Sequence, residues 1–188
     1  MDPIDALGAA RAEFAGKLEA VSPQRWEDAT PCDGWSASEL VQHVIRGNRM
    51  AVHLLDGCSR AEASQVQGVD LGEAPLQVFD ETADDQMRAF LKPGALDRVV
   101  QHPAMDIPGS MLLAFRVTDF VLHAWDLARG TGVDETLDPE LVAVVYAAMA
   151  PMASGLPETG MFGRGPSGTV PDDAPLQVRL LDLSGRRP

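Results

Sequence analysis

The sequence predicts an all-α protein, a four-helix bundle with additional short helices toward the C-terminus. Four long segments carry apolar residues at the three- and four-residue spacing of an amphipathic helix. The connections between them are long and rich in turn-forming residues, and little of the sequence resembles a strand. Helices of this kind bury their apolar faces by packing against one another, so these observations favour a bundle.

The first two helices are predicted from their N-terminal caps. Asp2 is a capping residue, and Pro3 follows it in the first turn of a helix that runs to about residue 20. A turn-rich connector occupies 21–35. Ser36 and Glu39 then have the S-x-x-E spacing of a capping box, which opens the second helix.

The remaining helices are bounded by glycine and proline residues. The second helix is predicted to end at Gly57, with Gly47 as a mild fault inside it. A third amphipathic helix is predicted over 75–94, a fourth over 110–130 and a fifth over 137–150. The fifth helix begins with an aspartate cap and a proline, the combination that also opens the first helix.

The other segments are predicted to be connections or a short terminal helix. Residues 58–74 are polar and are expected to form a loop, and a brief extended piece is predicted at 98–101. The Gly/Pro-rich stretch 151–171 is expected to be irregular. Leucines at helical spacing predict a helix within 172–186, capped by Asp172 or its neighbour, although a strand is also compatible with that stretch.

Composition and charge restrict the class of protein. The 188 residues are expected to form a single domain, 1–188, large enough to fold around its own core. Twenty-eight acidic against 15 basic residues give a net charge of −13, which argues against nucleic acid or an anionic membrane as a partner. The most apolar window, 141–153, is too short to span a bilayer. Cys32 and Cys58 lack CxxC spacing and are expected to be free thiols, so a cytoplasmic protein is predicted.

The segment DFVLHAWDLARG, 119–130, contains three acidic or imidazole side chains in an otherwise apolar run. At about 100° per residue, His123 lies about 40° from Asp119 around the helix, and Asp126 lies about 20° from it on the other side. All three side chains are therefore predicted to point in one direction. Buried charges of this kind need partners. The spacing is that of a D-x-x-x-H metal chelate, in which Asp126 is either a further ligand or orients a ligand.

A third ligand must come from another helix, and His43 is the histidine best placed to supply it. It lies in the middle of the second predicted helix, whereas His53 is near the end of that helix and His102 is in a loop. Packing the second helix against the fourth would bring His43 over Asp119 and His123. One carboxylate and two imidazoles suit zinc, nickel or iron. A core histidine and a surface ion pair remain the alternatives to this metal site.

Three stretches also resemble a known family. They are TPCDGWSASELVQHV at 30–44, DFVLHAWDLARGTG at 119–132, and the tail from GMFGRGP onward. They are similar to actinobacterial proteins of the DinB-like superfamily, related to the N-terminal domain of mycothiol-dependent maleylpyruvate isomerase. The resemblance implies a DinB-like four-helix bundle that holds a divalent metal, zinc or nickel, at His43, Asp119 and His123. The chain departs from the pattern at Asp119, where the isomerase carries the longer glutamate.

The function expected from this combination is that of a metal-dependent enzyme using mycothiol, a thiol S-transferase or a related isomerase acting on a small electrophile. Three protein ligands would leave one coordination position open for a thiol, as in catalytic zinc sites. Trp35, Arg46 and Arg116 are the predicted substrate contacts. The alternative is a bundle without catalysis, in which the metal stabilises the fold or senses a ligand. The expected partners are small molecules, with a homodimer as the candidate assembly.

Overall fold

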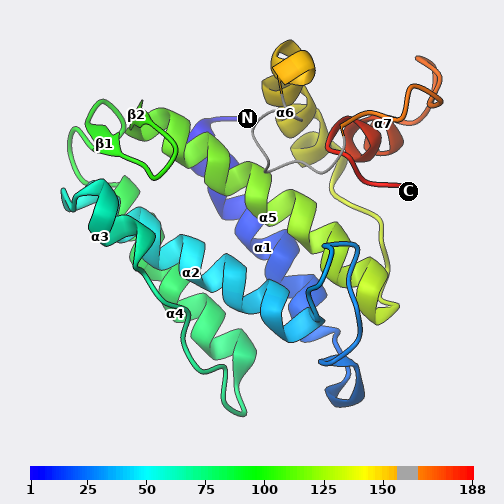
Figure 1. Cartoon of the computed structure of the whole chain (residues 1–188), viewed down its shortest axis with the longest axis horizontal. Coiled ribbons are helices and arrows are strands. Elements are labelled where there is room, and N and C mark those ends of the chain that lie inside the picture. The colour runs from blue at the N-terminus through cyan, green and yellow to red at the C-terminus, as the bar shows by residue number, and fades with distance from the viewer. Residues whose placement is uncertain (156–164) are drawn as a thin grey trace. The chain divides into compact units, whose positions relative to one another are not determined.

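The computed structural model describes residues 1–155 and 165–188, most of which are helical (Figure 1). The chain divides into two compact units. One unit comprises Asp2–Glu135, and the other comprises Thr136–Pro188 together with Met1. The predicted all-α fold is confirmed, while a single domain over the whole chain stays a prediction. Among the described residues, no helix combines the length and the apolarity needed to cross a membrane.

The first unit is a bundle of four long helices (Figure 1). They are α1 over Pro3–Glu19, α2 over Ala37–Leu55, α4 over Pro75–Phe90 and α5 over Gly109–Thr131. Each helix contacts two others, because α1 lies beside α4 and α5, and α2 also lies beside α4 and α5. This ring of contacts encloses an aromatic core. The ring of Phe79 lies 4.9 Å from that of Phe14 and 5.6 Å from that of Phe120, between centroids.

The predicted caps explain where the first two helices begin. Asp2 Oδ1 accepts a hydrogen bond of 2.9 Å from the Ile4 N–H at the start of α1. At the start of α2, the Glu39 N–H donates to Ser36 Oγ over 3.3 Å, and the Ser36 N–H donates to Glu39 Oε2 over 2.8 Å. The predicted capping box is therefore confirmed. Each such cap stabilises its helix by about 1 kcal/mol.

Glycines in the left-handed region lie just beyond the ends of two helices. Gly57 has φ 95° after α2, which agrees with the prediction that this helix ends there. Gly132 has φ 73° after α5 and is its C-cap. A residue with a side chain rarely adopts this conformation, whereas glycine does so at little cost. α5 therefore passes through its predicted end at Gly130 and stops at Gly132.

Two short helices occur in segments predicted to be connections. Pro23–Arg25 forms a 3-10 turn, η1, between α1 and α2. The prediction of a loop over 58–74 is wrong in part, because Arg60–Ser64 forms the helix α3. Its N-terminus has a second capping box, in which the Ser59 N–H donates to Glu62 Oε2 over 2.8 Å. The S-x-x-E spacing of Ser59 and Glu62 is the sequence signal that identifies this helix.

A small antiparallel hairpin precedes α5. Val99–Gln101 forms β1, close to the extended piece predicted at 98–101, and Asp106–Pro108 forms β2. Val100 lies opposite Ile107, and both side chains are buried while their neighbours along each strand are exposed. β2 is absent from the sequence prediction, because three residues are too few to show the alternation typical of a strand.

The second unit contains α6 over Pro139–Met149 and α7 over Leu176–Leu183, which contact each other. Both helices agree with the sequence prediction. Asp138 Oδ1 accepts a hydrogen bond of 2.7 Å from the Glu140 N–H, which is the expected cap of α6. No side chain caps α7, so the predicted cap at Asp172 or its neighbour is wrong.

The connection between these two helices is described only in part. The sequence predicts an irregular segment over 151–171, but a 3-10 helix, η2, occupies Ala150–Gly155 at its start. Residues 156–164 of the predicted segment lie outside the described residues. From residue 165 to the start of α7 the chain forms turns and bends without a helix or strand, as predicted for this part.

Candidate metal centre

Two neighbouring helices of the first unit bring the three predicted ligands together. α2 carries His43, and α5 carries Asp119 and His123 one turn apart. His43 Nε2 and His123 Nε2 each lie 3.4 Å from the same oxygen, Asp119 Oδ1. The two imidazole rings are 5.0 Å apart between centroids. One nitrogen from each histidine and one oxygen of the aspartate all lie within 4.8 Å of one another.

These separations are those of ligands around one tetrahedral ion. Two donor atoms about 2.0–2.1 Å from such an ion are about 3.3–3.4 Å from each other. The two 3.4 Å distances from Asp119 Oδ1 agree with that spacing. A donor set of two imidazoles and one carboxylate also suits a divalent first-row ion. The residues present therefore fit a bound metal ion.

Asp126 lies on the other side of the His123 ring. Its Oδ2 is 2.9 Å from His123 Nδ1, and the Asp126 side chain is buried. The distance is that of a hydrogen bond and is shorter than the spacing of two ligands around a tetrahedral ion. This contact places a proton on Nδ1 and leaves Nε2 directed at Asp119. Asp126 therefore lies behind His123 rather than beside the other two predicted ligands.

Arg116 holds the second oxygen of Asp119. Its guanidinium donates to Asp119 Oδ2 over 2.7 Å, and only 5% of the residue is exposed. It also donates to Gln86 Oε1, the Val44 carbonyl and Asn48 Oδ1 over 2.8 to 3.1 Å. Such a network is what a buried charge requires. The sequence predicts Arg116 as a substrate contact, but the structure places it beneath the ligands, where it orients Asp119.

The close packing of Arg116 explains the glycine in the interior of α2. A Cβ atom at Gly47 would lie 2.1 Å from Arg116 Nη1 and 2.7 Å from Arg116 Cζ. Glycine costs about 1 kcal/mol relative to alanine inside a helix, but here it leaves room for the guanidinium. The apparent fault in the helix pattern is therefore a packing requirement.

The other two predicted substrate contacts, Trp35 and Arg46, differ in position. The half-buried indole of Trp35 lies 4.7 Å from the His43 ring and 6.2 Å from the His123 ring, between centroids. It therefore forms a wall of the ligand cluster. Arg46 is exposed on α2, and within the described parts of the chain it makes no hydrogen bond or ion pair. Of these two residues, Trp35 is the one that packs against the histidine rings.

The positive groups around Asp119 keep its carboxylate ionised. Burial alone would favour the neutral carboxyl, but Arg116 and then His123 outweigh it and hold the pKa of Asp119 well below its usual range. Burial also opposes protonation of His123, but Asp119 and then the hydrogen bond to Asp126 outweigh it and raise the pKa of His123 well above its usual value. The two carboxylates thus stabilise positive charge at the imidazole between them.

Cys32 is a member of this site that the sequence motifs do not identify. Its Sγ lies 3.4 Å from Asp126 Oδ2 and 3.8 Å from His123 Nδ1. Both cysteines are free thiols, as predicted. The signal available in the sequence is the position of Cys32 in the turn TPCDGW, directly before the capping box of the helix that carries His43.

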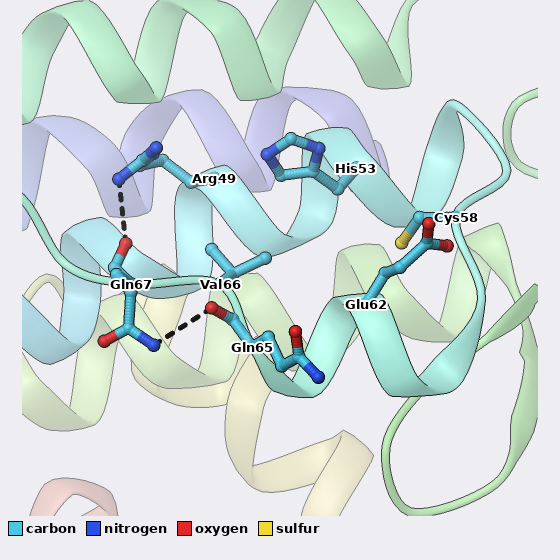
Figure 2. A pocket seen from close by; sticks show the side chains of 7 residues that line it. All are labelled: Arg49, His53, Cys58, Glu62, Gln65, Val66 and Gln67. Carbon is cyan, nitrogen blue, oxygen red and sulfur yellow. Dashed lines mark hydrogen bonds between the residues drawn. The ribbon is translucent and has the colours of Figure 1, made fainter.

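A separate hollow of about 460 Å³ lies at the C-terminal end of α2, beside α3 (Figure 2). It contains His53 but none of the three predicted ligands. Arg49 Nη1 donates to the Gln67 carbonyl in this hollow over 2.8 Å. His102, the remaining histidine, packs against Phe115 with 5.8 Å between ring centroids. The hollow is therefore distinct from the ligand cluster, and its lining residues are Arg49, His53, Cys58, Glu62, Gln65, Val66 and Gln67.

The fold and the cluster define a helical-bundle protein in which two neighbouring helices bring together side chains of the types that hold metal ions. The family model for the mycothiol maleylpyruvate isomerase N-terminal domain matches residues 7–128, a range that includes His43, Asp119 and His123. The chain belongs to this family. The resemblance stated from the sequence motifs is thereby confirmed.

Sequence relatives and solved structures agree with this assignment. Two uncharacterized proteins from two strains of Mycobacterium tuberculosis are each 30% identical over 175 residues, covering 93% of this chain and 89% of the relative. The crystal structure of the mycothiol-dependent maleylpyruvate isomerase matches with a TM-score of 0.63 at 14% identity, covering 81% of this chain and 68% of that chain. A mutant of the isomerase gives a TM-score of 0.65 at the same identity and coverage. At this identity, the structural matches establish the fold.

Proposed function

We propose that the chain binds one divalent metal ion, zinc or nickel, through His43 Nε2, Asp119 Oδ1 and His123 Nε2. The observation that carries this proposal is the pair of 3.4 Å distances from one carboxylate oxygen to imidazole nitrogens on two neighbouring helices. Three protein ligands leave a coordination position for a further small ligand, as in catalytic zinc sites. The side chains of His43, Asp119 and His123 are 28%, 20% and 12% exposed, so a small molecule can reach them.

The residues around the ligands would keep them in place. Asp126 accepts the Nδ1 proton of His123 and so keeps Nε2 available. Arg116 occupies Asp119 Oδ2, which leaves Oδ1 as the oxygen offered to the ion. Arg116 also offsets the charge of that carboxylate, so the loaded site would carry a net positive charge and attract a thiolate. Trp35 would exclude water from one side of the site.

We further propose that the chain is a thiol S-transferase or a related thiol-using enzyme, with mycothiol as the thiol and a small electrophile as the second substrate. The support is membership of the mycothiol maleylpyruvate isomerase N-terminal domain family. A divalent ion favours the thiolate form of a thiol placed beside it, and the thiolate is the nucleophilic form. In such an addition, the S–H bond breaks, the sulfur forms a bond to the electrophilic carbon of a polarised double bond, and the proton is taken up at the other end of that double bond. The proposed location is the cytoplasm.

Thiol consumption tests this function. Protein loaded with zinc or nickel should accelerate the loss of mycothiol in the presence of at least one member of a panel of small electrophiles. His123→Ala protein treated in the same way should show only the uncatalysed rate, because a proposed ligand has been removed. Equal, uncatalysed rates in both proteins across the panel would favour the alternative, a metal-binding bundle without catalysis.

Asp126→Asn should weaken metal binding without abolishing it. The amide has nearly the same shape and can still accept the Nδ1–H of His123, but it lacks the charge that makes the imidazole a better donor. Losses on the order of 10–100-fold in affinity are typical for such partners of a metal-ligating histidine. Titration calorimetry with zinc or nickel measures the change. If Asp126→Asn lost the ion as completely as His43→Ala, Asp126 would be a ligand itself and the assignment would be wrong.

A further inference from the structure

Cys32 lies in a tight turn whose backbone is held at several points. The Trp35 N–H donates to the Cys32 carbonyl over 3.0 Å, and the Thr30 N–H donates to the Trp35 carbonyl over 2.9 Å. Thr30 Oγ1 accepts a hydrogen bond of 3.3 Å from the Cys32 N–H. Gly34, with φ 78°, supplies the left-handed residue inside the turn. These bonds fix the backbone of Cys32 and with it the direction of its Cα–Cβ bond.

The same turn packs closely on the C-terminal half of α5. A Cβ atom at Gly130 would lie 3.0 Å from the Ala29 carbonyl oxygen and 3.1 Å from Thr30 Cα, so the approach depends on a glycine in the helix. Arg25 Nε donates to the Thr131 carbonyl at the end of α5 over 3.3 Å. The contact between Cys32 and α5 is therefore part of a larger interface within the bundle and does not rest on one side chain.

The thiol and the imidazole meet at one oxygen. Cys32 Sγ is 3.4 Å from Asp126 Oδ2, and His123 Nδ1 is 2.9 Å from the same atom. A thiol is a weak donor, and a carboxylate oxygen accepts from it. We infer that Cys32 is a positioning residue for the proposed metal centre, because its S–H shares the Asp126 oxygen that holds the His123 proton. This role rests on the proposed metal site.

Because Asp126 Oδ2 accepts from both groups, its hydrogen bond to His123 is weaker than it would be without the thiol. A carboxylate oxygen that accepts fewer hydrogen bonds attracts each remaining donor more strongly. A carboxylate that accepts a hydrogen bond from a metal-ligating histidine raises the basicity of the imidazole. The Cys32 thiol limits that effect, because it donates to the same oxygen of Asp126. The contact also ties the turn that carries Trp35 to the helix that carries two of the ligands. Removing the thiol thus alters the bond between Asp126 and His123 while leaving every proposed ligand in place.

Three variants separate this role from a general effect on stability. Cys32→Ala removes the donor, Cys32→Ser keeps a hydroxyl donor, and Cys58→Ala alters the other cysteine, which lies in the hollow of Figure 2. In chelator-treated protein, NMR should show the His123 Nδ1–H proton shifted downfield in Cys32→Ala, because its bond to Asp126 is strengthened. Cys32→Ser should stay close to the wild-type position and Cys58→Ala should match it. An unshifted His123 signal in Cys32→Ala would overturn the inference.

Cobalt(II) provides a second readout at the proposed metal centre. Its d–d absorption bands should shift in Cys32→Ala and be retained in Cys32→Ser. The affinity should change by less than the roughly 10–100-fold expected for Asp126→Asn, because Cys32 acts through Asp126. If the wild type binds no cobalt, the proposed metal site fails and the role of Cys32 beside a metal fails with it, whereas the NMR measurement still shows whether Cys32 shares the Asp126 oxygen. If the wild type binds cobalt and the bands of Cys32→Ala are unchanged, the inference fails and the proposed metal site stands.

Discussion

His43→Ala and His123→Ala proteins are each expected to lose stoichiometric divalent metal while keeping their helical content. Each substitution removes one of three proposed ligands, so the loss should exceed the roughly 10–100-fold typical for residues that only support a ligand. The fold should survive, because the bundle is held together by its buried apolar core and not by these side chains. The side chains of His43 and His123 are 28% and 12% exposed, so truncating them leaves no large sealed cavity.

Elemental analysis after dialysis measures the metal content, and far-UV circular dichroism measures the helical content. His53→Ala is the matched control, because it removes an imidazole from the same helix. His53 lies in the separate hollow of Figure 2, away from the ligand cluster, so this variant should retain the wild-type metal content. Full occupancy of the His43→Ala protein would contradict the proposed ligand set.

The part of the cluster that can be predicted from the sequence depends on local geometry. Asp119 and His123 are one helical turn apart, so their spacing alone places them on one face of a helix. The caps at Asp2 and Ser36 are local in the same way, and both form as predicted. His43 requires one long-range assumption, that its helix packs against α5, and a four-helix bundle satisfies it. The structure adds the distances, which agree with the proposed ligand set.

The features that the sequence does not reveal depend on packing between distant segments. Arg116 stands out as a cation in an apolar run, and nothing local indicates that Gln86 and Asn48 on other helices accept its hydrogen bonds. Cys32 and Asp126 are far apart along the chain and meet only because a turn packs on α5. Periodicity and motif spacing describe single helices, so relations of this kind become visible only in the folded bundle.

Gly47→Ala is expected to destabilise the bundle by on the order of 3 kcal/mol, although alanine is the better helix former. The new Cβ would lie 2.1 Å from Arg116 Nη1, so the guanidinium must move. Its movement would break the hydrogen bonds to Asp119 and Gln86. Losing the partner of a buried charge costs about 3–5 kcal/mol, against a gain of about 1 kcal/mol for replacing a helical glycine. Metal affinity should fall as well, because Asp119 loses the group that orients it.

Gly16→Ala is the control for helix propensity alone. Gly16 is exposed on α1, and outside its own helix backbone no atom lies within 4 Å of a Cβ built there. Alanine at this position should therefore stabilise the protein by up to about 1 kcal/mol. Urea unfolding in the presence of chelator measures both variants without the contribution of bound metal.

Arg116→Met completes a double-mutant cycle with Gly47→Ala. Arg116→Met should be destabilising by itself, because it leaves Asp119 without its cation. Once the guanidinium is gone, however, the Cβ at position 47 has no charged group to displace, so Gly47→Ala should no longer destabilise. If the changes in unfolding free energy of the two substitutions simply add in the double mutant, Gly47 is not needed to accommodate Arg116. A coupling free energy of several kcal/mol would instead identify Gly47 as the residue that allows Arg116 to reach Asp119. It would thereby connect a glycine in α2 to the proposed ligand on α5.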